Sequence, residues 1–417
     1  DLVRSRGLGD VYKRQSLNLS ECMDTSNKPL SGIKVIEMTH MVMGPAVGAI
    51  LGDLGADVIK IEPISGDKTR VLKKSGSGYF LTYNRNKRSL AMDIKKEEGK
   101  KIIKSLIRKS DVFIENFRPG AMDKLGFSYE NFSKLNPEII YCSAKGFLKG
   151  PYENRTALDE VAQMMGGLAY MTGPPGRPLR AGSSVIDIMG GMFGAIAILA
   201  ALQERRSTKK GQKVTSALYE NVVYLMGQHM AQTATTGSPP PPMSVRVAAW
   251  AVYDIFETKD EQQIFIGVVS DTQWKLFCES FGLEEYASDE SMDLNKGRVD
   301  QRDVIIPRLQ ELFKAYTKTD LMKKLDETGL PFAPISKPED LFDDPHLNES
   351  GGLLDIEIPA GGSTKLPAMP INMDGRRFDV HTPVPKVGEH SDQILKELGL
   401  DDEEIKDLFD LEVISKN

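Results

Sequence analysis

The sequence is poor in the residues that build disulfide frameworks and metal centres. It has three cysteines, Cys22, Cys142 and Cys278, which are far apart and odd in number. This argues against a disulfide framework and for a reducing compartment, so we expect a cytoplasmic protein. The five histidines form no pair with metal-ligand spacing such as His-x-x-x-His, and a metal enzyme is therefore not expected.

The chain also lacks an excess of positive charge and a long apolar run. Lys and Arg number 53 against 59 Asp and Glu, with no basic stripe, so nucleic acid is not an expected partner. No run reaches the roughly 18 to 20 apolar residues that cross a bilayer, and we expect no membrane association. The apolar stretch 189–202 instead predicts a buried helix. Residues 1–28 contain no apolar signal core, and we expect them to be a disordered or artefactual extension.

Strands and helices alternate along the first half of the chain. The alternation predicts an α/β fold with a mainly parallel sheet whose faces are covered by helices. The expected strands are 34–38, 57–61, 112–114 and 139–143, and the expected helices are 46–55 and 97–109.

A stiff connector separates this half from a second α/β unit. Four consecutive prolines at 239–242 form an extended segment rather than a core element. Beyond it we expect two paired strands, 250–256 and 264–269, and a helix 271–281 capped by Asp271. The predicted division is a large domain 29–235, a linker 236–245, a small domain 246–335 and a return to the large domain over 336–417.

Asp187 is the first candidate for chemistry. It follows the apolar pair Val185-Ile186 and precedes a glycine-rich apolar helix. The N-terminus of a helix carries partial positive charge and unpaired N–H groups, which favour an ionised carboxylate. Such an aspartate is either a helix cap or a nucleophile, and position alone favours the cap.

Other patterns bear on ligand binding. Gly44-Pro45 and Gly48 do not form the G-x-G-x-x-G fingerprint, which argues against nicotinamide binding, and no P-loop or G-x-S-x-G elbow is present. The basic segment 84–89 is either a solvated loop or part of an anion site. The segment 115–120 ends a predicted strand with Asn116, Phe117 and Arg118 together, which suggests a site for a phosphorylated nucleotide carrier.

Several segments, in chain order, resemble the family III CoA-transferases (CaiB/BaiF; the formyl-CoA transferase and carnitine CoA-transferase group). The resemblance implies a Rossmann-like large domain, a smaller α/β domain and an interlocked, ring-like homodimer. It also implies that Asp187 is the nucleophile, that CoA or acyl-CoA is a substrate, and that no cofactor is permanently bound. The segments are 29–35, 52–62, 86–89, 115–120, 161–167, 211–214 and 388–390.

The resemblance also implies a set of CoA contacts. They fall in the loop after the first strand, after the Asn-Lys-Arg-Ser segment, in the Asn-Phe-basic triplet and in the segment that flanks the thiol. Many relatives have Arg directly after Lys-Ile-Glu, where this chain has Pro63, so one contact is missing or supplied elsewhere. The implied residues are Val42, Met43, Met92, Asp93, Ile94, Lys95, Asn116, Phe117, Arg118, Lys124, Thr156, Ala157, Leu158 and Asp159.

The sequence leaves more than one activity possible within this family. Racemases of this fold use a His-Asp pair where this chain has Leu158-Asp159, and leucine cannot transfer a proton. We therefore expect transfer of CoA between carboxylic acids, with a racemase or hydrolase, or a CoA-binding protein without turnover, as alternatives. Arg246 is either a bidentate clamp on a dicarboxylate or a surface or structural cation.

The sequence also singles out four further side chains. We expect Gln163 and Tyr170 to line the same cavity as Arg246. His40 either approaches the thiol end of CoA or satisfies local backbone groups. His390 belongs to the family pattern, and we expect it to be structural.

Overall fold

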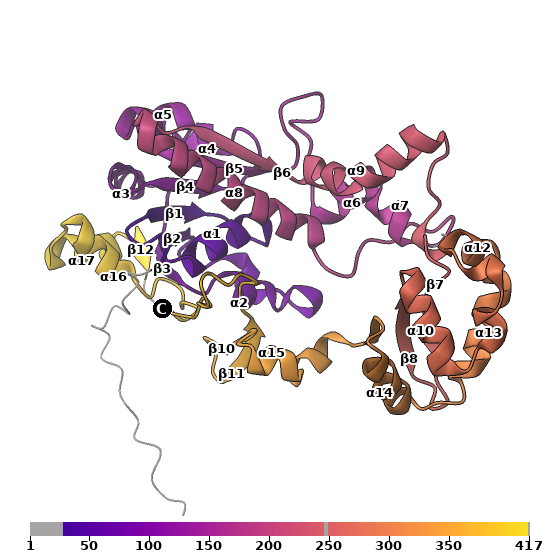
Figure 1. Cartoon of the computed structure of the whole chain (residues 1–417). Coiled ribbons are helices and arrows are strands. Elements are labelled where there is room, and N and C mark those ends of the chain that lie inside the picture. The colour runs from indigo at the N-terminus through magenta and orange to yellow at the C-terminus, as the bar shows by residue number, and fades with distance from the viewer. Residues whose placement is uncertain (1–27, 246–248, 416–417) are drawn as a thin grey trace, which may run out of the picture. The chain divides into compact units, whose positions relative to one another are not determined.

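The computed structural model describes residues 28–245 and 249–415, which form two compact units (Figure 1). The first unit contains the described residues up to 166 together with 181–226 and 354–415. The second contains 167–180 and the described part of 227–353. Each unit has its own hydrophobic core.

A seven-stranded sheet forms the centre of the first unit in the described part of the chain. Its order is β12-β3-β2-β1-β4-β5-β6, and all strands are parallel except β12, which runs antiparallel to β3. The predicted mainly parallel sheet is confirmed, and the order 3-2-1-4-5-6 is that of a dinucleotide-type Rossmann sheet. The strands are β1 (Lys34–Met38), β2 (Asp57–Glu62), β3 (Lys87–Met92), β4 (Val112–Glu115), β5 (Ile140–Lys145), β6 (Lys213–Ala217) and β12 (Ile414–Ser415).

Side chains alternate between the two faces of the sheet, as the period of two in a strand requires. In β4, Phe113 joins the core on one face, whereas Val112 and Ile114 join the core on the other. Helices cover both faces, so nearly every strand position is buried. The first face is covered by α3 (Glu97–Arg108), α5 (Tyr129–Leu135), α16 (Ser391–Leu398) and α17 (Asp402–Asp410), and the second by α1 (Met43–Asp53) and α8 (Val185–Thr208).

Helix α8 lies against α1 through a face of small residues. A Cβ at Gly190 would come within 2.6 Å of the Met43 side chain, and one at Gly191 would come equally close to Cβ of Ala46. Among the described residues, α8 is long and apolar enough to cross a membrane by length and composition, but this close packing makes it a core helix. The predicted buried helix is longer than expected and includes Asp187.

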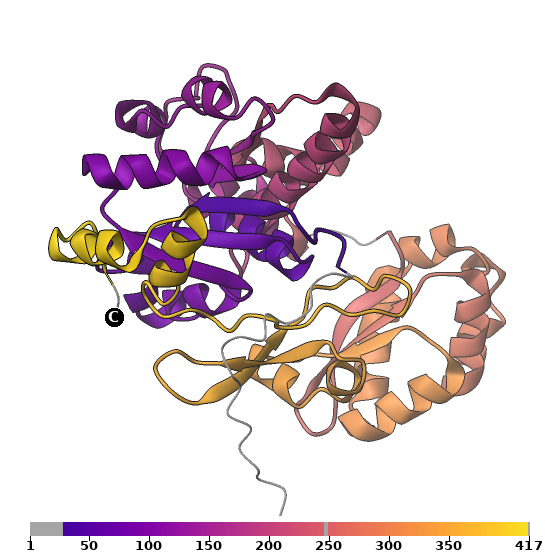
Figure 2. The same ribbon diagram turned by 90° about the vertical axis from the view of Figure 1, so that its left-hand side faces the viewer.

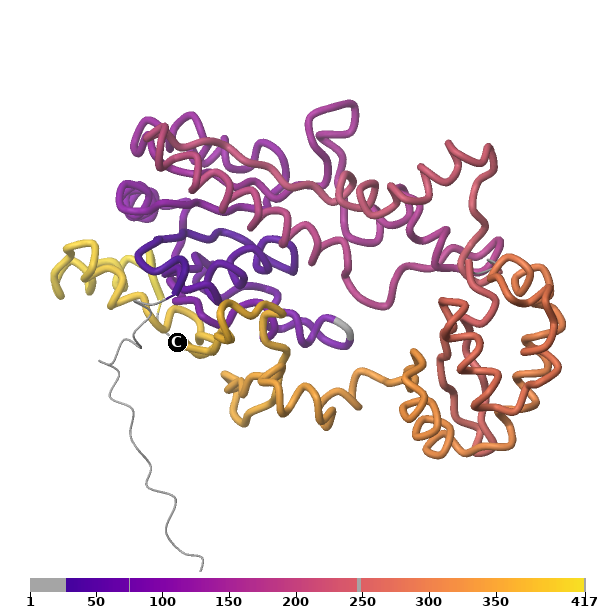
Figure 3. The backbone as a smooth tube through the Cα atoms, viewed as in Figure 1, coloured from indigo at the N-terminus to yellow at the C-terminus, as the bar shows by residue number. Residues whose placement is uncertain are grey.

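The C-terminal segment returns to the first unit beside β3 (Figure 3). Asn86, with φ +57°, accepts the N–H groups of His381 and Thr382 through Oδ1, at 2.8 and 3.0 Å. His390 accepts the Ser89 N–H at Nδ1, 3.2 Å away, which gives His390 a structural contact at the sheet edge. The returning segment also carries a hairpin of β10 (Leu353–Glu357) and β11 (Ser363–Pro367).

The second unit is a small antiparallel sheet packed on helices, visible as the orange region of Figure 2. The two predicted strands pair as expected, in antiparallel orientation, and β9 (Phe332–Pro334) adds to them. Helix α10 begins at Asp271 as predicted, but the prediction that Asp271 caps the helix is wrong. The hydroxyl of Ser270 accepts the Gln273 N–H at 3.2 Å. The elements are β7 (Val252–Glu257), β8 (Gln263–Val268), α10 (Asp271–Phe281), α13 (Arg302–Phe313) and α14 (Lys318–Thr328).

Candidate active site

The loops after β1 and β4 meet at the point where the strand order reverses. Ligands of open α/β sheets bind outside the carboxyl ends of the strands at this point. The His40 N–H donates to Oδ1 of Asn116 at 3.1 Å, and Nδ2 of Asn116 donates to the His40 carbonyl at 2.8 Å. The rings of His40 and Phe117 lie 5.4 Å apart. The structure therefore brings the two predicted CoA-binding loops into direct contact.

A partly buried ion pair holds the loop after β4. Nζ of Lys145 contacts the Glu115 carboxylate at 2.8 Å and donates to the Phe117 carbonyl at 2.6 Å. The other side of the loop is fixed by the Phe117 N–H, which donates to Oε2 of Glu115 at 2.9 Å. Both backbone groups of Phe117 are therefore bonded, which fixes the backbone of the loop after β4.

The other predicted CoA residues take different positions along this edge. Arg118 and Lys124 are exposed, Lys124 on the short helix α4 (Ala121–Leu125), and both cations are open to an anionic ligand. Val42 and Met43 are buried at the start of α1, where Val42 is the N-cap residue. Met92 is the last residue of β3 and 93–95 follow it; β2 separates this strand from β1 in the sheet.

The segment 156–159 lies after β5 and ends at the start of α6 (Asp159–Met165). Ala157 packs against Gly146, where a Cβ would come within 2.5 Å of the Ala157 methyl. Thr156 and Leu158 are exposed, whereas Asp159 is buried. The four residues predicted to flank the thiol therefore divide into three that lie toward the surface and one that points inward.

Asp159 fills the capping role at the start of α8. Its Oδ2 accepts the Ile186 N–H at 2.9 Å and the Asp187 N–H at 3.2 Å. Its Oδ1 accepts from Nε2 of Gln163 at 2.6 Å, and Oε1 of Gln163 accepts the Ala181 N–H at 2.8 Å. Gln163 is fully buried, so its side chain stabilises the start of α8 rather than presenting an amide to solvent.

Asp187 lies inside the first turn of α8, not at its cap. The N-cap residue is Ser184, and the Asp187 side chain is partly exposed. An ionised carboxylate in the first turn is stabilised by the positive end of the helix dipole. The position of Asp187 in the sequence favoured a capping role. In the structure, Asp159 accepts the N–H groups at the start of α8 instead.

Two tyrosines of α2 (Tyr79–Tyr83) face the start of α8. Burial, together with the negative charge of Asp187, raises the pKa of Tyr83, so its hydroxyl stays protonated at neutral pH. The hydroxyl of Tyr79 lies 3.4 Å from Oγ of Ser184. The candidate nucleophile thus lies beside the phenol groups of α2.

The cysteines of the described chain offer no competing nucleophile. Cys142 and Cys278 are buried free thiols. Burial raises the pKa of each to about 12, so neither forms a thiolate near neutral pH.

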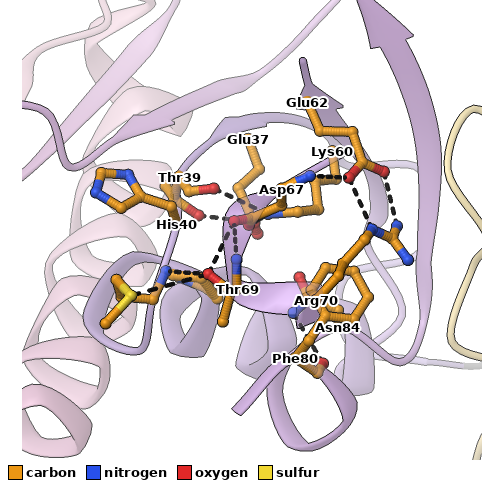
Figure 4. A network of polar contacts seen from close by, with 12 residues as sticks. Glu37, Thr39, His40, Lys60, Glu62, Asp67, Thr69, Arg70, Phe80 and Asn84 are labelled. Carbon is orange, nitrogen blue, oxygen red and sulfur yellow. Dashed lines mark hydrogen bonds and ion pairs between the residues drawn. The ribbon is translucent and has the colours of Figure 1, made fainter. Parts of the chain in front are cut away.

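A buried network of charges lies beneath the loop after β1 (Figure 4). Nζ of Lys60 lies 3.0 Å from Asp67 and 3.5 Å from Glu37, and Nζ of Lys87 lies 2.7 Å from Glu37. All four side chains are at most 3% exposed. Two cations and two carboxylates compensate one another, which is the condition for burying charge.

This network corrects one interpretation of the sequence. The segment 84–89 is not a solvated loop. Arg85 is buried against Asp53, with Nη2 2.6 Å from the carboxylate, and Arg88 binds Asp57 at the same distance. Together with Lys87, these cations bind carboxylates of the protein itself and are not open to an external anion.

Pro63, the departure from the family pattern, is exposed. The nearby Arg70 does not replace the absent arginine at the surface. Its guanidinium binds Glu62 at 2.7 Å and lies 3.8 Å from the Phe80 ring centroid.

Two residues predicted to bind the acid are not part of the first unit as the structure describes it. Arg246 is outside the described residues. Tyr170 is half-exposed and belongs to the second unit, on α7 (Leu168–Thr172).

The first unit has an α/β fold with a parallel sheet, and its candidate site lies at the carboxyl ends of the strands, where ligands of such sheets generally bind. The description of CoA-transferase family III matches residues 30–391. The chain therefore belongs to CoA-transferase family III, and the resemblance inferred from the sequence is confirmed.

Individual relatives cover nearly the whole chain. The succinyl-CoA:glutarate CoA-transferase of Homo sapiens is 33% identical over 409 residues, which cover 94% of this chain and 91% of that protein. The formyl-CoA:oxalate CoA-transferase of Streptomyces avermitilis is 33% identical over 402 residues, covering 91% and 98%. The crystal structure of a CAIB/BAIF family protein from Brucella suis has a TM-score of 0.79 and 34% identity, covering 89% of this chain and 100% of that one.

Proposed function

We propose that this CoA-transferase moves CoA from an acyl-CoA to a dicarboxylic acid through a covalent intermediate on Asp187. The observation that carries the proposal is the placement of Asp187 in the first turn of α8 while Asp159 caps the helix. The relatives named for glutarate and oxalate support a dicarboxylate as the acceptor.

The reaction begins with attack of an Asp187 carboxylate oxygen on the thioester carbonyl carbon. The C–S bond breaks, giving an acyl-aspartyl anhydride and CoA thiolate. The thiolate then attacks the aspartyl carbonyl, releases the donor acid and leaves an aspartyl-CoA thioester. The acceptor carboxylate attacks this thioester, forms a second anhydride, and the released thiolate attacks the acceptor's acyl carbon to regenerate Asp187.

CoA is held, in this proposal, along the carboxyl edge of the sheet. Phe117 offers a ring for stacking, and the exposed cations Arg118 and Lys124 offer charge for phosphates. The backbone at Val42 and Met43, and the segments 92–95 and 156–159, complete the proposed contacts. Binding of the large carrier offsets the cost of forming the high-energy anhydride.

A panel assay separates transfer from its alternatives. Purified protein is mixed with succinyl-CoA and separate carboxylic acids in deuterated water, and the products are resolved by mass spectrometry. CoA appearing on an acid supports transfer. Deuterium entering the α-carbon of an acyl-CoA supports a racemase, release of free CoA supports a hydrolase, and binding without turnover supports a CoA-binding protein.

We further propose that the enzyme is a homodimer that acts in the cytoplasm. Met192 and Ile196 of α8 are 49% and 55% exposed, and Tyr224 of α9 (Leu218–Thr236) is 73% exposed. Apolar side chains gathered on neighbouring positions are typical of a surface that binds another chain. Ile196→Asp should shift the mass measured by light scattering from dimer to monomer. An unchanged dimer would contradict this surface, and Lys296→Asp provides an exposed control in the second unit.

A further inference from the structure

The loop between β1 and α1 contains a strained backbone position. Met41 has φ +65°, in the left-handed region that L side chains rarely adopt. Such conformations persist only where surrounding contacts impose them. The Met41 N–H donates to Oγ1 of Thr69 at 3.0 Å, and this bond holds the strained residue in place.

Thr69 is itself held by a buried carboxylate. Oδ1 of Asp67 accepts from Oγ1 of Thr69 at 2.8 Å and from its N–H at 2.9 Å. Because the hydroxyl proton is directed to Asp67, the lone pairs of Thr69 Oγ1 are turned toward the Met41 N–H. The carboxylate thus fixes the direction in which the hydroxyl accepts.

Lys60 joins this support to the other side of the same loop. Its Nζ lies 3.0 Å from Asp67 and donates to the Thr39 carbonyl at 2.9 Å. The loop is therefore hydrogen-bonded on both sides of His40: Lys60 bonds to Thr39, and Thr69 bonds to Met41 (Figure 4).

Burial excludes water as a substitute for these contacts. Lys60, Asp67 and Thr69 are 0%, 5% and 2% exposed. In such surroundings a lost partner is not replaced by solvent, so the geometry of the loop depends on each member.

We propose that Lys60, Asp67 and Thr69 are positioning residues for CoA, which set the backbone of the loop 39–43 that meets the carrier. The inference rests on the proposed function, because it takes the backbone of Val42 and Met43 as a CoA contact. None of the three touches the reacting atoms at Asp187. They act on the affinity for CoA and not on the chemical step.

The test compares two substitutions at one position. Thr69→Val removes the hydroxyl and keeps the shape, whereas Thr69→Ser keeps the hydroxyl. Dissociation of CoA is measured by titration calorimetry, and kcat is measured at saturating acyl-CoA. We expect Thr69→Val to bind CoA about tenfold more weakly, as loss of one buried hydrogen bond implies, with kcat within about twofold of wild type. Thr69→Ser should bind as wild type.

A matched control lies in the second unit. Thr258 is also buried, at 3% exposure, and its hydroxyl donates to Asp260, two residues away in the chain as Asp67 is from Thr69. Thr258→Val should lower the melting temperature without changing CoA binding. Asp67→Asn, which keeps the shape and removes the charge that pairs with Lys60, should weaken CoA binding in the same direction as Thr69→Val.

The outcomes distinguish failure of the positioning role from failure of the proposed function. Unchanged CoA affinity in Thr69→Val and Asp67→Asn overturns the positioning role and leaves the proposed function standing. A fall in kcat at saturation with unchanged affinity also overturns it. If the wild-type protein neither binds CoA nor transfers it, the proposed function fails and this inference falls with it.

Discussion

Two groups of carboxylates lie near the carboxyl edge of the large sheet, and they are stabilised in different ways. Glu37 and Asp67 are buried and each is paired with a lysine. Asp159 and Asp187 meet at the start of α8, where Asp159 accepts backbone N–H groups of the helix. The first group is neutralised by fixed cations and the second is placed at the positive end of a helix.

This difference distinguishes carboxylates that stabilise the fold from the carboxylate that we propose reacts. A carboxylate paired with a buried lysine has its charge compensated, and moving it is costly. The helix dipole stabilises the charged form of a carboxylate in the first turn, and partial exposure leaves that carboxylate accessible to an electrophile. Within the α8 pair the division repeats, because Asp159 is buried and bonded to the backbone, whereas Asp187 is partly exposed.

Asp187→Asn should have the largest effect. The amide keeps the size of the side chain but is a poor nucleophile, so the rate of CoA transfer should fall by about 10⁴-fold or more. The dissociation constant for CoA should remain within a few-fold of wild type, because the proposed carrier contacts lie on other elements. Steady-state assays and calorimetry check both parts, and substantial turnover in this variant would remove Asp187 from the mechanism.

Asp159→Ala should act on stability first. It leaves the N–H groups of Ile186 and Asp187 without their acceptor, and loss of a cap costs about 1–2 kcal/mol. Urea unfolding should show this loss, and Asp159→Asn, which retains an acceptor oxygen, should lose less. Equal stability of the alanine variant and wild type would show that Asp159 does not cap α8.

The smallest expected effect is a pH dependence within the buried network. Burial lowers the pKa of Lys87 from its ordinary value of 10.5 to about 8. Between these values the unfolded chain holds the proton and the folded chain does not, so the free energy of unfolding rises with pH. Below pH 8 the folded state carries the full cost of the buried charge.

A comparison with Lys87→Met isolates this contribution. The variant has no titrating group at the position, so wild type should gain stability relative to it as the pH is raised from about 8 to about 10. Denaturant unfolding at several pH values measures the difference. A difference that does not vary with pH would show that Lys87 titrates normally in the folded protein.

Regular apolar periodicity made most of the sheet predictable. Strands β1, β2, β4 and β5 are apolar runs bounded by turns, and their parallel arrangement follows from the helices between them. Strand β3 was not predicted because its first half, Lys87-Arg88-Ser89, is polar, and β6 was not predicted because Lys213, Thr215 and Ser216 leave it without an apolar run. Their polar side chains find partners only in the folded chain, as when Arg88 binds Asp57.

The candidate site was predictable where a motif carried it and not where long-range contacts build it. Position before a glycine-rich helix singled out Asp187, but no local pattern showed that Asp159, far earlier in the chain, caps that helix. For the same reason the cap of α10 was assigned to Asp271 and not to Ser270. The charged segment 84–89 resembles a surface loop because its acidic partners, Asp53 and Glu37, precede it by more than thirty residues.

Trapping the intermediate tests the central claim most directly. Enzyme incubated with acyl-CoA and quenched with hydroxylamine should yield, on proteolysis and mass spectrometry, a peptide in which Asp187 has become a hydroxamate. Omission of acyl-CoA should leave the peptide unmodified. Active enzyme whose Asp187 peptide is recovered only in its unmodified form would contradict covalent transfer through this residue.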